Sequence, residues 1–334
     1  MRPFEYTSPT TYEQAAGLLD TNWGHTAILA GGTDLLSLMK DDIEQPGRLV
    51  NVKQVEDRAL MPHAITAAKN GGIVIGGLRT IQEVADASSV RQKYPALAEA
   101  CDNAASPQIR NMATIAGNLC QRPRCWYFRN GFGLLAMKDG KSLVAEGDNR
   151  YHAIFGNQGA AKFVSPSSIA PVLIAYNALM TVVGPGGRQR ELPVAKFFIA
   201  PREQDEREHM LAPNEVVAQI TLPPAPGVHA ASYEVRQKAA FDWPLASAAV
   251  ALTMAGANVR EARVVLGHVA PVPWISQEAA HALLGKPVNE QTADAAAQAA
   301  VAPATPLSKN AYKVQLARVA IKRAILKAAK GGQA

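Results

Sequence analysis

The stretch from Ile28 to Lys40, ILAGGTDLLSLMK, places two adjacent glycines between an apolar run and a predicted helix. Because Gly31 and Gly32 have no Cβ, successive backbone N–H groups can turn toward a bound anion, and Thr33 adds a hydroxyl donor. A phosphate group would suit such a loop. For one loop taken alone, the alternative is an ordinary turn between a strand and a helix, in which the glycines only supply positive φ angles.

A second loop of this kind follows further along the chain, at residues 113–121 with the sequence ATIAGNLCQ. A run of small residues again leads into a glycine. Thr114, Gly117 and Asn118 supply positions for close approach and for hydrogen bonding. Two such loops could hold the two ends of one diphosphate, so the pair favours a binding site over two unrelated turns.

A capping box at Thr10 to Glu13 is expected to start a helix that ends near Leu19. The first glycine loop then follows a strand at 27–30 and precedes a helix at 34–40. A strand at 48–52 completes a βαβα-like opening. The other expected strands span 72–77, 179–183, 216–222, 232–238 and 263–269, and the other expected helices span 94–104, 169–177 and 310–330, with one more after the Thr80 cap. The last helix carries an apolar stripe, listed in order as Val314, Ala317, Ile321, Ile325 and Ala328.

A chain of 334 residues with 48% apolar residues is large enough for two or three domains, and Pro223 to Gly227 is the clearest linker. The net charge of +6 is spread along the chain, which favours an anionic ligand over nucleic acid. No segment approaches the length of an apolar membrane span, and the N-terminus has no apolar leader. Three cysteines do not make a disulfide framework, so we expect a cytoplasmic protein, with the periplasm open to a protein exported together with a signal-bearing partner.

The segment from Cys120 to Tyr151 mixes cysteines, arginines and aromatic residues with turn signals, and it is expected to be an inserted loop that lies against a partner. Cys120 and Cys125 have a C-x₄-C spacing that could ligate iron. The alternative, two partly buried free thiols, is favoured because no further cysteine follows to complete a site. Cys101 is expected in the helix before the second glycine loop.

These pieces, in this order, resemble a known family. AGGTDLL, IRNMATIAGN, RQKAAFDWPLASAAVAL, VLGHVAPVPW and TPLSKNAYKV are similar to the FAD-binding medium subunit of the molybdenum hydroxylases, a family that includes xanthine dehydrogenase, carbon monoxide dehydrogenase and aldehyde oxidoreductases. The pieces LCQRPRCWYFR and GDNRYHAIFG look most like the flavin subunits of bacterial three-subunit aldehyde or xanthine dehydrogenase-like enzymes.

The resemblance implies an α+β fold with two domains. Residues 1–225 would form a two-subdomain FAD-binding module of the vanillyl-alcohol-oxidase (PCMH) type, with subdomains at about 1–58 and 59–225 and the insert at about 120–151. Residues 228–330 would form a smaller α+β C-terminal domain with an antiparallel sheet. The pyrophosphate of FAD would be held mainly by backbone N–H groups, with little need for a lysine.

The resemblance also implies which residues contact FAD. They belong to the two glycine loops and to three later segments: Ile28, Leu29, Ala30, Gly31, Gly32, Thr33, Asp34, Leu35, Ala113, Thr114, Gly117, Asn118, Cys120, Ser167, Ser168, Val217 and Arg236. Ser168 stands where many relatives have an aspartate. Arg236 aligns with a flavin-adjacent lysine of some relatives, where a cation could stabilise the anionic reduced flavin.

Some relatives carry an additional [4Fe–4S] cluster, held by cysteines that begin at positions like Cys120 and Cys125 and continue into a loop that contains cysteine. Here that loop, NGFGLLAMKDGKSLVAEGDN, contains none, so we expect no metal site on this chain.

By the resemblance, electrons leave an aldehyde, a purine or a related heterocycle at a molybdenum-cofactor large subunit. They pass through a small [2Fe–2S] subunit to the FAD of this chain and then to an external acceptor. The insert and the C-terminal domain are the candidate partner contacts, and deletion of Arg129 to Glu146 is expected to weaken assembly while sparing FAD.

Two alternatives remain for the function of the chain. A stand-alone flavin oxidase would need a base, for which His25, His152 and His268 have no favouring context; a flavin-free scaffold is suggested by Ser168.

Overall fold

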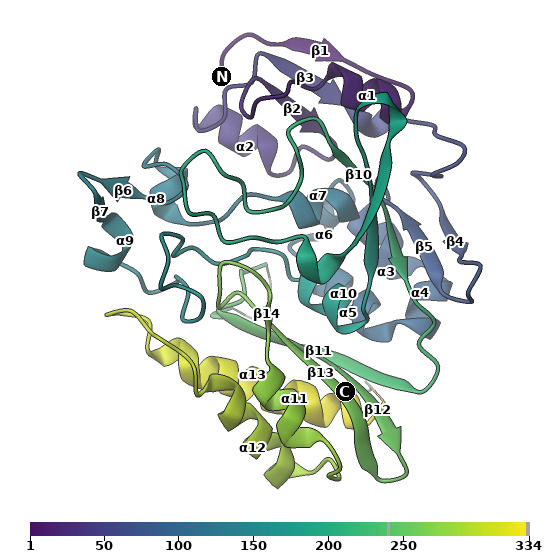
Figure 1. The fold of residues 1–334 in the computed structure, drawn as a ribbon, viewed down its shortest axis with the longest axis vertical. Helices are drawn as coiled ribbons and strands as arrows, with labels where there is room; N and C mark the ends of the chain where they lie inside the picture. Colours follow the sequence, from purple (N-terminus) through teal and green to yellow (C-terminus); the bar gives the residue numbers. More distant parts are fainter. Residues whose placement is uncertain (239–240, 332–334) are drawn as a thin grey trace.

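The computed structural model describes residues 1–238 and 241–331. The chain has the expected α+β fold, and its N-terminal subdomain, second subdomain and C-terminal domain follow one another along the long axis of the molecule (Figure 1). Among the described residues, no helix combines the length and the apolar character needed to cross a membrane.

The N-terminal subdomain is a three-stranded parallel sheet, in the order β1 (Glu5–Thr7), β3 (Arg48–Asn51) and β2 (Thr26–Leu29), joined through α1 (Tyr12–Leu18) and α2 (Leu35–Lys40). The βαβα-like opening is therefore confirmed. The expected capping box at Thr10 to Glu13 is wrong by one position. The side chain of Thr11 caps α1 by accepting from the N–H of Gln14 at 3.2 Å, and the Gln14 side chain accepts from Thr10.

The second subdomain is built on a five-stranded antiparallel sheet with helices packed on it. The strand order is β4 (Ile65–Ala67), β5 (Ile73–Gly76), β10 (Val216–Leu222), β8 (Leu179–Val183) and β9 (Gln189–Pro193). The helices are α3 (Ile81–Asp86), α4 (Ser88–Lys93), α5 (Pro95–Asn103), α6 (Pro107–Arg110), α7 (Ile115–Cys120) and α10 (Ala170–Ala175). Ile75 and Ile220 pair across the sheet centre and share one core with Val84, Leu97 and Leu173 of the helices.

The insert forms a small folded unit of its own, with α8 (Trp126–Arg129), β6 (Met137–Lys138), β7 (Lys141–Ser142) and α9 (Leu143–Glu146). Its apolar side chains Phe128, Leu134 and Leu135 share a core with Leu38 of α2 and with Phe163. The insert therefore packs against the N-terminal subdomain of its own chain. The expectation that it lies against a partner can hold only for its outer surface.

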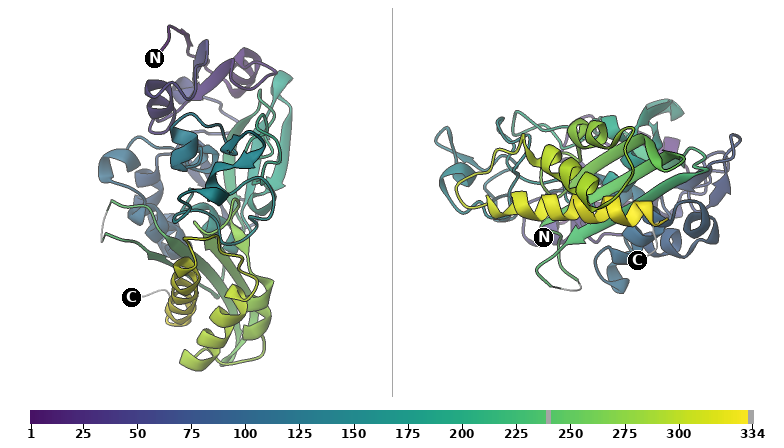
Figure 2. Two further views of the ribbon diagram at one scale, coloured as in Figure 1. Left: turned by 90° about the vertical axis from the view of Figure 1, so that its left-hand side faces the viewer. Right: turned by 90° about the horizontal axis from the view of Figure 1, so that it is seen from below.

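The C-terminal domain is an antiparallel sheet covered on one face by three helices (Figures 1 and 2). Its strands follow the order β11 (Val228–Val235), β12 (Ala246–Ala255), β13 (Asn258–Gly267) and β14 (Trp274–Ile275), and its helices are α11 (Gln277–Leu283), α12 (Glu290–Val301) and α13 (Tyr312–Ala329). The stripe on α13 is buried from Ala317 to Ala328, as expected. β11 and β13 begin before the expected Ser232 and Arg263, because the twisted hairpins extend past the apolar core into half-exposed positions.

Candidate cofactor-binding site

One large cavity, with a volume of about 590 Å³, lies where the two subdomains meet the segment that follows β11. Both glycine loops line it, and so does the strand β10 through Val217. Trp23, His209, Arg236 and Trp243 form other parts of the wall. The two loops that sequence analysis identified separately therefore belong to one site.

The two glycine loops touch each other directly through their backbones. A Cβ added at Gly31 would lie 1.9 Å from the carbonyl oxygen of Met112 and 3.0 Å from the Cα of Ala113. Real Cβ atoms are never this close to backbone, so no other residue fits at Gly31 without moving the second loop. Gly32 has a φ of +72°, a left-handed conformation that glycine adopts at no steric cost.

The second loop is fixed by hydrogen bonds of its own. The hydroxyl of Thr114 caps α7 by accepting from the N–H of Gly117 at 3.1 Å. Ser167 donates to the Oδ1 of Asn118 at 2.6 Å and accepts from the N–H of Ala170 at 3.0 Å. Ser167 does not itself line the cavity, so it orients Asn118 from outside the cavity wall.

The first loop offers the donor set that a diphosphate needs. The amide N–H groups of residues 32–35 donate no hydrogen bond to any residue within 1–238 or 241–331, although all four residues line the cavity. Successive free N–H groups that include a left-handed glycine form a concave site for an anion. Within the described part of the chain, no lysine lines the cavity. The residues present therefore fit the diphosphate of FAD bound through backbone donors.

The structure brings nearly all of the predicted cofactor-binding residues to the cavity wall. Those that line it are Ile28, Ala30, Gly31, Gly32, Thr33, Asp34, Leu35, Ala113, Thr114, Gly117, Asn118, Cys120, Ser168, Val217 and Arg236. Leu29 and Ser167 do not. Leu29 lies in β2 with its side chain against Gly32, at 3.4 Å from the position of an added Cβ. That these residues contact FAD stays a prediction.

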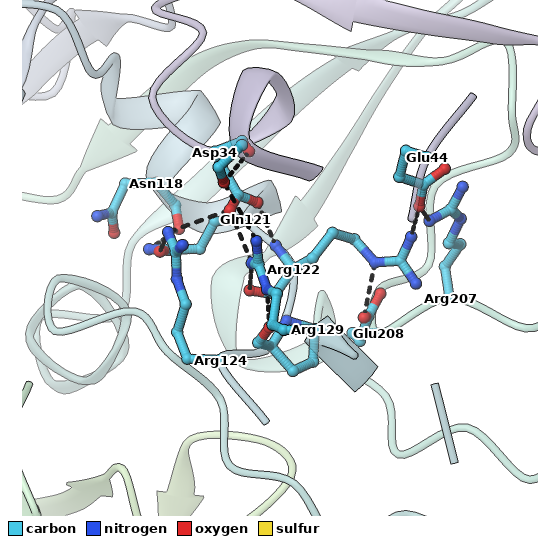
Figure 3. A network of polar contacts seen from close by, with 11 residues as sticks. Asp34, Glu44, Asn118, Gln121, Arg122, Arg124, Arg129, Arg207 and Glu208 are labelled. Carbon is cyan, nitrogen blue, oxygen red and sulfur yellow. Dashed lines mark hydrogen bonds and ion pairs between the residues drawn. The ribbon is translucent and has the colours of Figure 1, made fainter. Parts of the chain in front are cut away.

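The side chain of Asp34 faces the insert and binds three of its arginines (Figure 3). Its carboxylate accepts from the backbone N–H of Arg122 and from Nη2 of Arg129, both at 2.8 Å, and pairs with Arg124 at 3.1 Å. Only 17% of the Asp34 side chain is exposed. Asp34 therefore contributes its backbone to the cavity, while its charge holds the insert.

The ion network continues from Arg122 away from the loop (Figure 3). Arg122 donates through Nε to Glu208 at 2.8 Å and pairs with Glu44, which also accepts from Arg207 at 3.0 Å. The guanidinium of Arg122 lies 4.8 Å from the ring centroid of Phe128. This network was not predicted from the sequence. The arginine-rich RPRCWYFR run was a usable signal for it, but its acidic partners lie far away in the sequence.

Arg236 is not a free cation in the structure. It is mostly buried, forms an ion pair with Glu234 and donates to the carbonyl oxygen of Asn103 at 2.6 Å. Burial raises the pKa of Glu234, and the charge of Arg236 opposes that rise. The positive charge expected beside the flavin is therefore offset by a neighbouring carboxylate.

Ser168, at the position where relatives have an aspartate, lies beside a histidine of the C-terminal domain. Its Oγ is 3.1 Å from Nε2 of His268, which has a φ of +62°. Burial, with the nearby charges of Lys313 and Arg236, lowers the pKa of His268 to about 3. His268 is therefore a neutral hydrogen-bonding group at physiological pH. His25, by contrast, is an exposed partner of Asp20, outside the cavity wall.

The cysteines are free thiols with different surroundings. Cys101 is buried in α5, as expected, and Cys120 lines the cavity. Burial raises the pKa of Cys120 to about 12, so it is protonated. Cys125 lies 3.1 Å from Nε2 of His152, whose pKa burial lowers to about 4. Among residues 1–238 and 241–331, no group of three or more His, Cys, Asp or Glu side chains is arranged to hold a metal ion.

Family models and relatives match nearly the whole chain. Residues 2–225 match the FAD binding domain in molybdopterin dehydrogenase, and residues 231–328 match the CO dehydrogenase flavoprotein C-terminal domain. The aldehyde oxidoreductase FAD-binding subunit PaoB of Escherichia coli (strain K12) is 34% identical over 95% of this chain and 96% of its own length. The carbon monoxide dehydrogenase medium chain of Hydrogenophaga pseudoflava is 28% identical over 96% of both chains.

A solved structure is also similar to the whole chain. It is that of carbon monoxide dehydrogenase from Hydrogenophaga pseudoflava which lacks the Mo-pyranopterin moiety of the molybdenum cofactor, and it aligns with a TM-score of 0.76 at 28% identity. The alignment covers 100% of this chain and 99% of that one. The similarity in sequence and in fold therefore extends across both domains.

Proposed function

Since this chain belongs to the family of FAD-binding medium subunits of the molybdenum hydroxylases, we propose that it is the electron-transfer subunit of a heteromeric enzyme. In this proposal it takes electrons from a small [2Fe–2S] subunit and passes them to an external acceptor. The substrate, an aldehyde, a purine or a related heterocycle, is oxidised on a separate molybdenum subunit.

The observation that carries the proposal is the contact between the two glycine loops at one cavity. Gly31 against Met112 joins the loops, and the free N–H groups of residues 32–35 provide the diphosphate site between them. Bound FAD supplies the chemistry of accepting electrons singly and releasing them as a pair. The chain itself binds and orients that cofactor: Ser167 holds Asn118 in place, and Glu234 sets the charge around Arg236.

The number of cysteines in this sequence supports the placement of the iron–sulfur centres on another subunit. Two [2Fe–2S] centres need eight thiolate ligands, and this sequence has three cysteines. The two [2Fe–2S] centres of the proposed enzyme therefore belong to a partner chain.

Titration of the purified chain with FAD tests the cofactor assignment. We expect saturable binding, with flavin released by acid precipitation and identified as FAD in the supernatant. Copurification with co-expressed large and small subunits tests the partners. Colourless protein that ignores added FAD would instead support a flavin-free scaffold. Aldehyde turnover by the isolated chain would support a stand-alone flavin oxidase.

A further inference from the structure

A second cavity, much smaller than the first, lies behind the wall of the large one. Its volume is about 10 Å³, and Ser165, Glu208 and His209 line it together with apolar side chains such as Leu119 and Phe198. A volume of about 10–15 Å³ is that of a single water-sized probe, so the space has room for one water molecule.

Three polar atoms of the residues around this small cavity have no hydrogen-bond partner among the described residues: Ser165 Oγ, Glu208 Oε2 and His209 Nδ1. Their residues are only 3%, 7% and 8% exposed. Buried polar atoms are nearly always paired, with protein or with ordered water. The residues that carry these three unpaired atoms all line one water-sized space, and a buried water typically makes two to four hydrogen bonds.

The side chains of Glu208 and His209 are held in place by other contacts, and the backbone of Ser165 is fixed by a hydrogen bond of its own. Glu208 accepts from Arg122 through Oε1 at 2.8 Å, which leaves Oε2 available. The His209 ring stacks on Phe197 at a centroid distance of 5.3 Å and meets Trp23 edge-on at 5.7 Å. The backbone N–H of Ser165 donates to the carbonyl oxygen of Ala270 at 2.9 Å. Glu208 and His209 therefore cannot turn toward a different partner without breaking these contacts.

We propose that the small cavity binds a single water molecule through Ser165, Glu208 and His209, and that this water positions the His209 ring in the wall of the FAD cavity. The carboxylate can only accept from the water, whereas the Ser165 hydroxyl can donate or accept and the His209 nitrogen does one or the other according to the tautomer. His209 lines both cavities, so it is a residue through which the small cavity and the large one are connected. This makes His209 a cofactor-binding residue that the sequence did not indicate.

Burial lowers the pKa of His209 to about 4, with the charge of Arg122 acting in the same direction. The ring is therefore neutral at physiological pH, with one nitrogen as donor and the other as acceptor. A hydrogen bond to the water satisfies Nδ1 in either tautomer, so the water holds the orientation of the ring without a change in its charge.

The water is tested by a high-resolution crystal structure of the full chain. We expect one ordered water within about 3.2 Å of at least two of the three atoms. A dry cavity, or a direct hydrogen bond from Ser165 to Glu208 or His209, would overturn the proposal. This measurement is independent of whether the chain binds FAD.

The positioning role rests on the proposed function and is tested by Ser165→Val, which removes the hydroxyl and fills the cavity. We expect the ¹⁵N resonances of the His209 ring to shift and the Kd for FAD to rise about 3- to 10-fold, the effect of losing one hydrogen bond. Ser165→Ala is the second variant if the valine prevents folding. The matched control is Ser247→Ala, which removes another buried and unpartnered hydroxyl that lines neither cavity.

The outcomes are distinguishable. Unchanged His209 resonances and an unchanged Kd in Ser165→Val would refute the positioning role, even with the water present. The same loss of affinity in Ser247→Ala would also refute it. Failure of the wild-type chain to bind FAD would overturn the proposed function, while the crystal structure would still decide whether the water is bound.

Discussion

The carboxylate of Asp34 in the first glycine loop accepts a hydrogen bond of 2.8 Å from Nη2 of Arg129 in the insert (Figure 3). A single side chain thus connects the predicted diphosphate site with the insert. Arg122 and Arg124 bind the same carboxylate. The position of the first loop and the fold of the insert should therefore depend on each other.

Asp34→Asn should destabilise the chain and loosen the insert. The substitution keeps the size of the side chain but leaves Arg124 and Arg129 without the carboxylate that balances their charge. Removing one partner of a largely buried ion pair costs about 3–5 kcal/mol. We expect a decrease of that size in the free energy of unfolding, measured in urea, and faster proteolysis within 130–146. Asp205→Asn, at an exposed acid, is the control; equal stability of the two variants would contradict the role given to Asp34.

Gly31→Ala should separate the two glycine loops. The new Cβ would overlap the carbonyl oxygen of Met112 at 1.9 Å, and backbone cannot rotate away as a side chain can. Overpacking of this kind costs about 1–3 kcal/mol, and here the displacement falls on the cofactor site. We expect weaker FAD binding together with a lower Tm. Gly17→Ala is the matched control, because a Cβ at that exposed position of α1 meets nothing within 4 Å. Unchanged FAD affinity in Gly31→Ala would refute the contact between the loops.

The glycine loops, most of the strands and the apolar stripe of α13 could be predicted from the sequence, because each depends on residues close together in the chain. The ion network could not. Asp34, Arg122 and Glu208 come together only in the folded chain, and no local sequence pattern predicts which arginine pairs with which acidic residue. The pairing of Arg236 with Glu234 shows another limit. Alignment with a lysine in relatives predicted the cation, but not the adjacent carboxylate that offsets its charge.

The chain should lose stability below neutral pH. Burial lowers the pKa of His152 and His209 to about 4 and that of His268 to about 3. As the pH falls below about 6.5, the unfolded chain binds protons that the folded chain does not. The free energy of unfolding therefore falls by up to about 1.4 kcal/mol per pH unit for each histidine, until the folded pKa is reached.

Urea unfolding at several pH values between 7.5 and 5 would measure this slope. His268→Asn removes one of the three groups while keeping a residue that tolerates a positive φ. The slope of its free energy of unfolding against pH should therefore be smaller by up to about 1.4 kcal/mol per pH unit, the contribution of one proton. His281→Asn, at an exposed position of α11, should keep the slope of the wild type. A wild-type free energy that does not change with pH would contradict the assignment of three buried, neutral histidines.

The visible spectrum of the purified chain should show flavin and no iron–sulfur absorbance. No cysteine follows Cys120 and Cys125 in the sequence to complete a set of four thiolate ligands. We expect structured bands that leave with FAD on acid precipitation, and the same spectrum in Cys125→Ser. A broad brown absorbance that bleaches on reduction, beyond what flavin explains, would mean that these cysteines ligate iron.

The outer surface of the insert should bind a partner subunit through Phe132. Its ring is 47% exposed and is held edge-on against Tyr127, at a centroid distance of 6.4 Å. Deletion of residues 129–146 would also remove the contact of Arg129 with Asp34 and so disturb the cofactor loop, whereas Phe132→Asn changes only the surface. We expect Phe132→Asn to weaken copurification with the large and small subunits while FAD binding stays as in the wild type. Met61→Asn replaces an apolar side chain of similar exposure, 41%, outside the insert and should leave assembly intact. A complete complex with Phe132→Asn would exclude this residue from the interface.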